Sequence, residues 1–89
     1  MPGLVQRIRG YERTRRFWRL VDVRGRTDCW AWHGSFDREG RAVYRGRAAD
    51  EHAYQLMRGP LPGGSGLRRT CSDLRCVNPE HFEPVAGEG

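Results

Sequence analysis

The stretch CSDLRCVNPEH, residues 71–81, places two cysteines and a histidine within eleven residues. A structural zinc site needs four ligands in a tetrahedral arrangement, and these are typically thiolates and imidazoles. The spacing C-x4-C-x4-H supplies three such ligands, so the fourth must come from elsewhere in the chain. Cys29 is the obvious donor because it is the only other cysteine, and His33 and His52 are the alternatives.

Length and composition also favour a metal. With 89 residues, 37% of them apolar and 12 of them glycine, the chain can form one domain with a thin core. Domains of this size usually need disulfides or a metal as a staple. Three cysteines leave one over in any intramolecular disulfide scheme. No apolar run approaches the roughly 20 residues of a membrane span, and the N-terminus has no apolar signal region. We therefore expect a cytoplasmic protein without membrane contact that holds a structural Zn²⁺.

The charge distribution predicts a polyanionic partner. All 16 basic residues are arginine, and the formal net charge is +5. Residues 1–26 hold eight of these arginines against two carboxylates. The guanidinium fork suits phosphate oxygens and the edge of guanine, so double-stranded DNA is the expected partner, and a merely solvated arm is the alternative. No aromatic stacking platform of the kind that single strands favour is evident in the sequence.

The chain divides into a basic arm (1–14), a domain (15–86) and a short tail (87–89). Within the domain, Trp30 and Trp32 alternate in the strand manner, Gly40 is placed to supply a left-handed turn residue, and Asp50 is placed to cap a helix that Gly59 ends. The predicted elements are a short helix within 15–23, strands over 29–34 and 41–47 that form a hairpin, a helix over 49–58, a short strand over 67–71, and a tight turn that begins near Pro79.

These residues resemble a known family. The segments RFWRLVDVRGRTDCWAWHG (16–34) and GPLPGGSGLRRTCSDLRCVNPEHFEPV (59–85) are similar to the small HNH endonucleases of bacteriophages, over roughly residues 16–85. The spacing of the cysteines and the NPxH motif is also similar to the His-Cys box homing endonucleases and to the N-terminal DNA-binding domain of Smad proteins. The resemblance implies a small α+β domain stapled by zinc. Its ββα-metal (HNH-like, His-Me finger) core would contain a β-hairpin, one middle helix and a truncated C-terminal helix. The implied zinc ligands are Cys29, Cys71, Cys76 and His81.

Three departures from the family pattern indicate that the nuclease chemistry is lost. Arg69 stands where the family has its general base, and a guanidinium has no acceptor for a proton. Ala49, Asp50 and Glu51 stand where the family has Ala-His-Arg. The family's metal-binding Asn lies about nine residues beyond the NPxH histidine, and the sequence ends eight residues beyond His81. We therefore expect no catalytic residues.

The resulting expectation is a nuclease-dead HNH-like zinc module that binds DNA. By analogy it could serve as a transcription regulator of phage or phage-derived origin. One alternative is an active endonuclease that uses Mg²⁺ at a rebuilt site, with His52 as the rescue candidate. The second is a protein-interaction module, with a protein partner or a homodimer. Alternation along 41–47 would place Arg41, Val43, Arg45 and Arg47 on one face. The predicted DNA contacts are Arg7, Arg9, Arg13, Arg15, Arg16, Arg41, Arg45, Arg47, Arg68 and Arg69.

Overall fold

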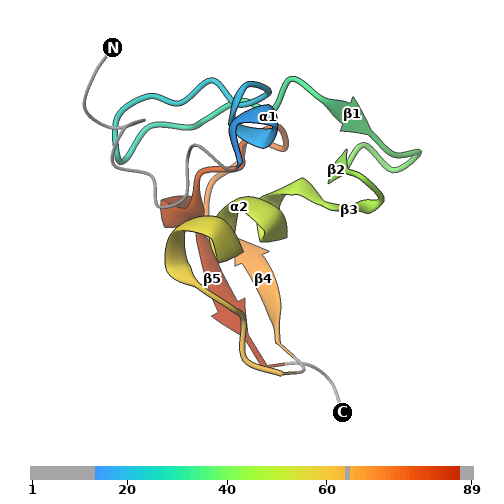
Figure 1. The fold of residues 1–89 in the computed structure, drawn as a ribbon. Coiled ribbons are helices and arrows are strands. Elements are labelled where there is room, and N and C mark those ends of the chain that lie inside the picture. The colour runs from blue at the N-terminus through green and yellow to red at the C-terminus, as the bar shows by residue number, and fades with distance from the viewer. Residues whose placement is uncertain (1–13, 64, 87–89) are drawn as a thin grey trace.

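The fold consists of short helices and strands (Figure 1). They surround a small core that is rich in aromatic side chains. A computed structural model of the protein describes residues 14–63 and 65–86. This described part has the α+β composition that the sequence predicts. Its elements are α1 (Arg15–Trp18), β1 (Ser35–Phe36), β2 (Ala42–Tyr44), β3 (Arg47–Ala48), α2 (Ala49–Arg58), β4 (Gly66–Arg69), the 3₁₀ helix η2 (Pro79–His81) and β5 (Phe82–Val85).

The strands form two separate antiparallel sheets on different sides of α2. β1, β2 and β3 form a three-stranded sheet in that order, and β4 pairs with β5. In Figure 1 the β4–β5 ribbon extends below α2, whereas the three-stranded sheet lies above and to the right of it. β3 runs directly into α2, which packs against β2, β3 and η2. The helix therefore connects the two sheets.

The predicted strand over 41–47 is wrong as a single strand because the chain turns within it. Tyr44 pairs with Arg47 across a two-residue loop. Both loop residues are left-handed, with φ of 53° at Arg45 and 81° at Gly46. This is the pattern of a type I′ turn, which matches the twist of the flanking strands. Arg41, Val43, Arg45 and Arg47 thus do not alternate along one strand face.

The predicted strand over 29–34 is extended, but its partners differ from those expected. Val21 bridges Trp32, and Ala31 bridges Cys76. The Trp32 N–H donates to the Arg75 carbonyl at 2.8 Å, and Val77 N–H donates to the Trp30 carbonyl at 2.9 Å. This segment lies between residues 20–22 and 75–77. The hairpin is instead formed by β1 and β2, around a turn in which Gly40 has the predicted positive φ of 81°.

The middle helix is confirmed, with a corrected N-terminus. Its N-cap is Ala48, without a side-chain hydrogen bond, and Asp50 lies inside the first turn. The Asp50 carboxylate accepts from the N–H of Glu51, so it does not cap the helix as predicted. Gly59 ends the helix with a φ of 93°. Ala53 lies on the buried face of the helix.

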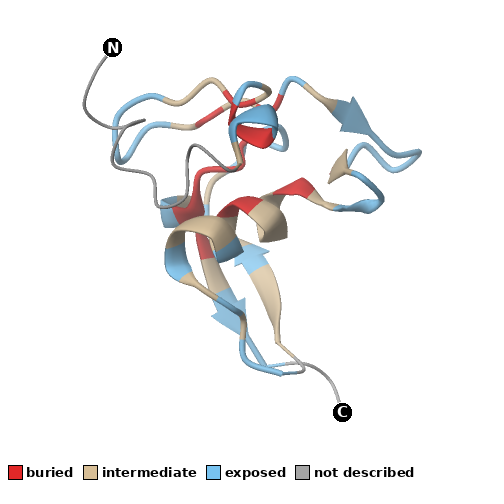
Figure 2. Cartoon of the chain, viewed as in Figure 1, coloured by how far each residue is buried: buried red, intermediate tan, exposed pale blue. Residues whose placement is uncertain are grey.

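Aromatic side chains fill most of the core. Phe17, Trp18, Trp30 and Trp32 are each at most 3% exposed. The rings of Phe17 and Trp18 meet edge to face with centroids 4.9 Å apart, and those of Phe17 and Trp32 lie 5.2 Å apart. Aromatic pairs in such arrangements contribute beyond their buried area. Figure 2 shows that burial is concentrated where α1 and α2 meet the segment that leads into η2. The predicted helix within 15–23 is confirmed, though it spans one turn only.

The expected truncated C-terminal helix is not formed in the described residues. Pro79 takes the first position of η2, as the turn prediction requires. After His81 the chain becomes extended and Phe82 pairs with Arg69, so residues 82–85 form a strand. The β4–β5 ribbon therefore occupies the region where a helix was expected to begin. Among the described residues, no helix is long and apolar enough to cross a membrane.

Candidate metal centre

Four ligand side chains from opposite ends of the domain converge at one point. Cys29, Cys71, Cys76 and His81 each offer one ligand atom, and these atoms all lie within 4.8 Å of one another. Nδ1 of His81 is 3.5 Å from Sγ of Cys29 and 3.3 Å from Sγ of Cys76. Zn–S bonds of about 2.3 Å and Zn–N bonds of about 2.0 Å in a tetrahedron imply an S···N separation of about 3.5 Å. The four residues therefore fit a tetrahedral Zn²⁺, and the cluster agrees with the predicted ligand set.

The orientation of His81 is fixed by its second ring nitrogen. Nε2 lies 2.9 Å from the carbonyl oxygen of Thr27. A carbonyl oxygen only accepts, so Nε2 must carry the proton. Nδ1 is then the unprotonated nitrogen, and it faces the thiols. A backbone carbonyl that orients a histidine in this way is a common second contact at zinc sites.

The three cysteine thiols differ in pKa. Burial, and then the neighbouring Cys76 and Cys71, raise the pKa of Cys29 to about 12. Burial is also the largest influence on Cys76 and raises its pKa. At Cys71 burial is outweighed by hydrogen bonds from the backbone of Asp73 and from Arg69, which lower the pKa to about 7. The three thiols cannot ionise together without a cation, and a divalent ion would displace their protons.

Arg69 clamps the loop that carries two of the ligands. Its Nη1 donates to the carbonyls of Asp73 at 2.5 Å and Cys76 at 2.8 Å, and its Nη2 donates to that of Leu74 at 3.3 Å. The guanidinium also lies over the Phe82 ring, 4.9 Å from its centroid. The planar fork of arginine suits several acceptors at once. Arg69 thus holds the loop that carries Cys71 and Cys76 in shape, a role that the sequence did not suggest.

Asn78 ties the C-terminal ligands to the segment before Cys29. Its Nδ2 donates to the carbonyls of Arg26 at 3.0 Å and Asp28 at 2.5 Å, and its Oδ1 accepts from the Glu80 N–H at 2.8 Å. The side chain is fully buried. Its position inside the NPxH motif suggests a turn residue, but the link to residues 26–28 could not be read from local spacing.

The other candidates for metal or catalytic roles lie elsewhere. His33 is exposed, and His52 packs its ring against those of Phe17 and Tyr44 at 4.7 and 5.2 Å. Neither joins the cluster, which is the one group of this kind among the described residues. Asp50 and Glu51 lie in the first turn of α2.

The arginines predicted to contact DNA fall into three groups. Arg7, Arg9 and Arg13 lie outside the described residues. Arg68 pairs with Glu83, and Arg69 is held by the metal loop, so both side chains already have protein partners. The third group is exposed and has no carboxylate partner within the described part of the chain: Arg15, Arg16, Arg41, Arg45 and Arg47.

Three further arginines belong with this third group and were not predicted. Arg75 is exposed, and its guanidinium donates to the Trp32 carbonyl and not to a carboxylate of the described residues. Arg19 follows α1 and Arg38 lies in the β1–β2 turn, and both are exposed without an ion pair among the described residues. Only the overall arginine content could have pointed to them.

Comparison with known proteins identifies no relative. No protein-family model matches the chain, and no curated protein or solved structure matches it. The function must therefore be argued from the residues themselves.

Proposed function

We propose that this protein is a non-cleaving, HNH-like zinc module that binds DNA through the arginines of α1 and the three-stranded sheet. The observation that supports this most strongly is that arginines on one side of the domain pair with carboxylates, whereas those on the other side do not. Near the metal cluster, Glu80 lies beside Arg26 and Arg58, and Glu83 beside Arg68. These two carboxylates offset part of the positive charge on the side of the domain that carries η2, β4 and β5.

The opposite side keeps its positive charge. Arg15 and Arg16 on α1 and Arg45 and Arg47 around the β2–β3 turn have no carboxylate partner in the described ranges 14–63 and 65–86. Arg16, Arg45 and Arg47 line one common hollow, so the two elements present charge to the same space. Unpaired, exposed guanidinium groups on one surface are the electrostatic footprint that a phosphate backbone attracts.

The proposal that the module does not cut rests on the chemistry of Arg69. A guanidinium stays protonated and cannot accept a proton from water. Its donors are also already used by the carbonyls of Asp73 and Cys76. The HNH-like part of the proposal rests on the sequence resemblance over roughly residues 16–85. On this proposal the Zn²⁺ supplies folding energy, as closed Cys3His sites do.

The experiment uses the full zinc-loaded chain, purified free of host nucleases, with labelled random-sequence duplex across a range of salt. We expect retardation that weakens steeply with salt, because phosphate contacts release counterions. A triple Arg16→Gln, Arg45→Gln, Arg47→Gln variant should lose most of this binding and show a smaller salt slope. The matched control replaces three ion-paired arginines, Arg24, Arg58 and Arg68, by Gln.

Two results would point to other functions. Magnesium-dependent nicking of plasmid by clean protein, lost on mutating His52 or Asp50, would indicate the endonuclease alternative. No retardation at low salt would move the assignment to a protein-interaction module. Equal loss of binding in the control and the triple variant would contradict the surface proposed here.

A further inference from the structure

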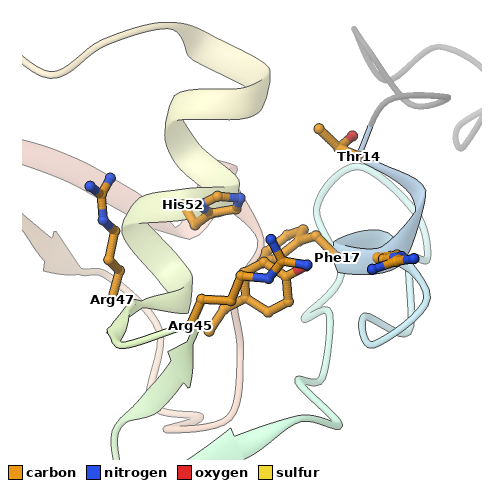
Figure 3. Close-up of a pocket in the computed structure, with 7 residues that line it drawn as sticks. Thr14, Phe17, Arg45, Arg47 and His52 are labelled. Atoms are coloured by element: carbon orange, nitrogen blue, oxygen red, sulfur yellow. The ribbon is translucent and has the colours of Figure 1, made fainter.

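A hollow of about 320 Å³ lies where α1, the β2–β3 turn and α2 meet. Figure 3 shows Thr14 and Phe17 on one side, Arg45 in the centre, and His52 on α2 with Arg47 beside it. This volume is at the lower end of the range of small-ligand sites, about 300–1,000 Å³. It could take one small ligand or one unit of a polymer, but not a duplex.

Three aromatic rings line the hollow. The His52 ring centroid is 4.7 Å from that of Phe17 and 5.2 Å from that of Tyr44. Phe17 is buried and closes the floor, whereas Tyr44 and His52 are half-buried and keep part of their surface accessible. The three residues come from α1, β2 and α2, so the platform exists only in the folded domain.

The charged residues at the hollow are all positive. Arg16, Arg45 and Arg47 line it, and within the described part of the chain no carboxylate does. Glu51 lines the adjoining hollow, which shares Arg47 and His52. The rings and the guanidinium groups together combine a stacking surface with an anion-binding rim.

The backbone of Arg45 adopts a conformation that residues with a side chain rarely adopt. Arg45 adopts a φ of 53° at a turn position where Asn or Gly is strongly preferred. Non-glycine residues with positive φ are uncommon, and strained positions often occur at functional sites. The conformation brings the guanidinium over the Tyr44 ring, 5.3 Å from its centroid. The charge therefore lies directly beside the stacking surface.

His52 completes the site as a neutral ring. Burial, and then the charges of Arg47 and Arg45, lower its pKa. A neutral imidazole can stack on an aromatic ligand without repelling the neighbouring guanidinium groups. It can also form a hydrogen bond with a phosphate or a base edge.

We propose that this hollow binds a single unpaired nucleotide of a DNA strand, with its phosphate at Arg16, Arg45 and Arg47 and its base on the rings of Tyr44 and His52. Bases stack on aromatic side chains regardless of sequence, while basic groups follow the backbone. The inference rests on the proposed DNA binding and deepens it. The module would prefer duplexes that contain a flipped-out, bulged or overhanging nucleotide.

The first experiment titrates the zinc-loaded protein with deoxyadenosine 5′-monophosphate and follows the His52 ring signals by NMR. We expect these signals to shift saturably, and the pKa of His52 to rise in the complex because the phosphate offsets Arg45 and Arg47. Arg45→Asn should weaken binding about tenfold, since it removes a charged contact from a position whose conformation Asn tolerates. Arg24→Asn, at an exposed arginine that pairs with Asp22, is the matched control and should bind like the wild type. Unshifted His52 signals, or equal effects of the two variants, would overturn the proposal.

The second experiment compares a fully paired duplex with the same duplex carrying one unpaired nucleotide. A preference of about tenfold for the unpaired form, reduced by Arg45→Asn and not by Arg24→Asn, is the expected result. Equal binding of both duplexes would overturn the nucleotide site and leave general DNA binding intact. Failure to bind either duplex would refute the proposed function, while the mononucleotide titration would still decide whether the hollow binds a nucleotide.

Discussion

Replacing Asn78 tests how the domain is held together, because its side chain links two segments of the chain without being one of the metal ligands. We predict that Asn78→Ala lowers the free energy of unfolding of the zinc-loaded protein by about 3 kcal/mol. The substitution removes two hydrogen bonds from Nδ2 and one to Oδ1, and each contributes about 1 kcal/mol net. The residue is fully buried, so water cannot easily replace the lost partners. Small domains have total stabilities of about 5–15 kcal/mol, so this loss is large.

The same substitution should weaken zinc binding. Asn78 donates hydrogen bonds to the carbonyls of Arg26 and Asp28. Thr27 lies between these two residues, and its own carbonyl orients the His81 ring. If the apo protein must fold in order to bind, a loss of about 3 kcal/mol corresponds to about a hundredfold weaker apparent affinity. The metal ligands themselves are unchanged, so any loss must come from their positioning.

The assay combines urea denaturation followed by circular dichroism with zinc competition against a colorimetric chelator at fixed pH. Ser72→Ala, at an exposed site in the same metal loop, is the matched control. Asn78→Asp keeps the acceptor for Glu80 but turns a carboxylate oxygen toward two carbonyls, so it should destabilise at least as much. An Asn78→Ala protein within about 0.5 kcal/mol of the control would refute the reasoning.

Three further predictions concern other parts of the site. Cys76→Ser should abolish stoichiometric zinc binding and the near-ultraviolet circular dichroism of the tryptophan core, because metal-binding energy is folding energy in so small a domain; a folded variant would contradict this. Arg69→His should lose the carbonyl contacts, destabilise the protein by about 1–3 kcal/mol and leave supercoiled plasmid intact with Mg²⁺, whereas restored nicking would show that the rest of a nuclease site is present. The pKa of His52 is lowered by folding, so the unfolded chain takes up this proton first as pH falls below about 6.5, and folded stability drops in that range. His52→Gln should lose less stability than the wild type between pH 7.5 and pH 5.5 in parallel urea titrations, and an identical loss would argue against this contribution.

The metal ligands were predictable because their chemistry leaves few alternatives. Two cysteines and a histidine at short spacing predict a metal site, and Cys29 was preferred over His33 and His52 as the fourth ligand because it is the only other cysteine. The helix over 49–58 was predictable because Gly59 ends a periodic apolar pattern.

Other features depended on partners that sequence does not specify. Trp30 and Trp32 alternate like strand residues, but their segment lies beside 20–22 and 75–77 and not beside the next strand. The arginine-rich stretch 41–47 has strand character, yet the left-handed pair Arg45 and Gly46 turns it back on itself.

The aromatic hollow was missed for a related reason. No stacking platform was evident in the sequence, because Phe17, Tyr44 and His52 are adjacent only in three dimensions.

The separation of the ligands has a consequence for how the protein is made. Cys29 and His81 are 52 residues apart, so the first ligand leaves the ribosome long before the last. Until then the tryptophans beside Cys29 lack the segment around Val77 that covers them. Incomplete chains with exposed apolar surface are prone to aggregation and degradation. A ligand that binds only the folded state raises the population of that state by mass action. The zinc supply during synthesis would therefore set how many chains escape proteolysis.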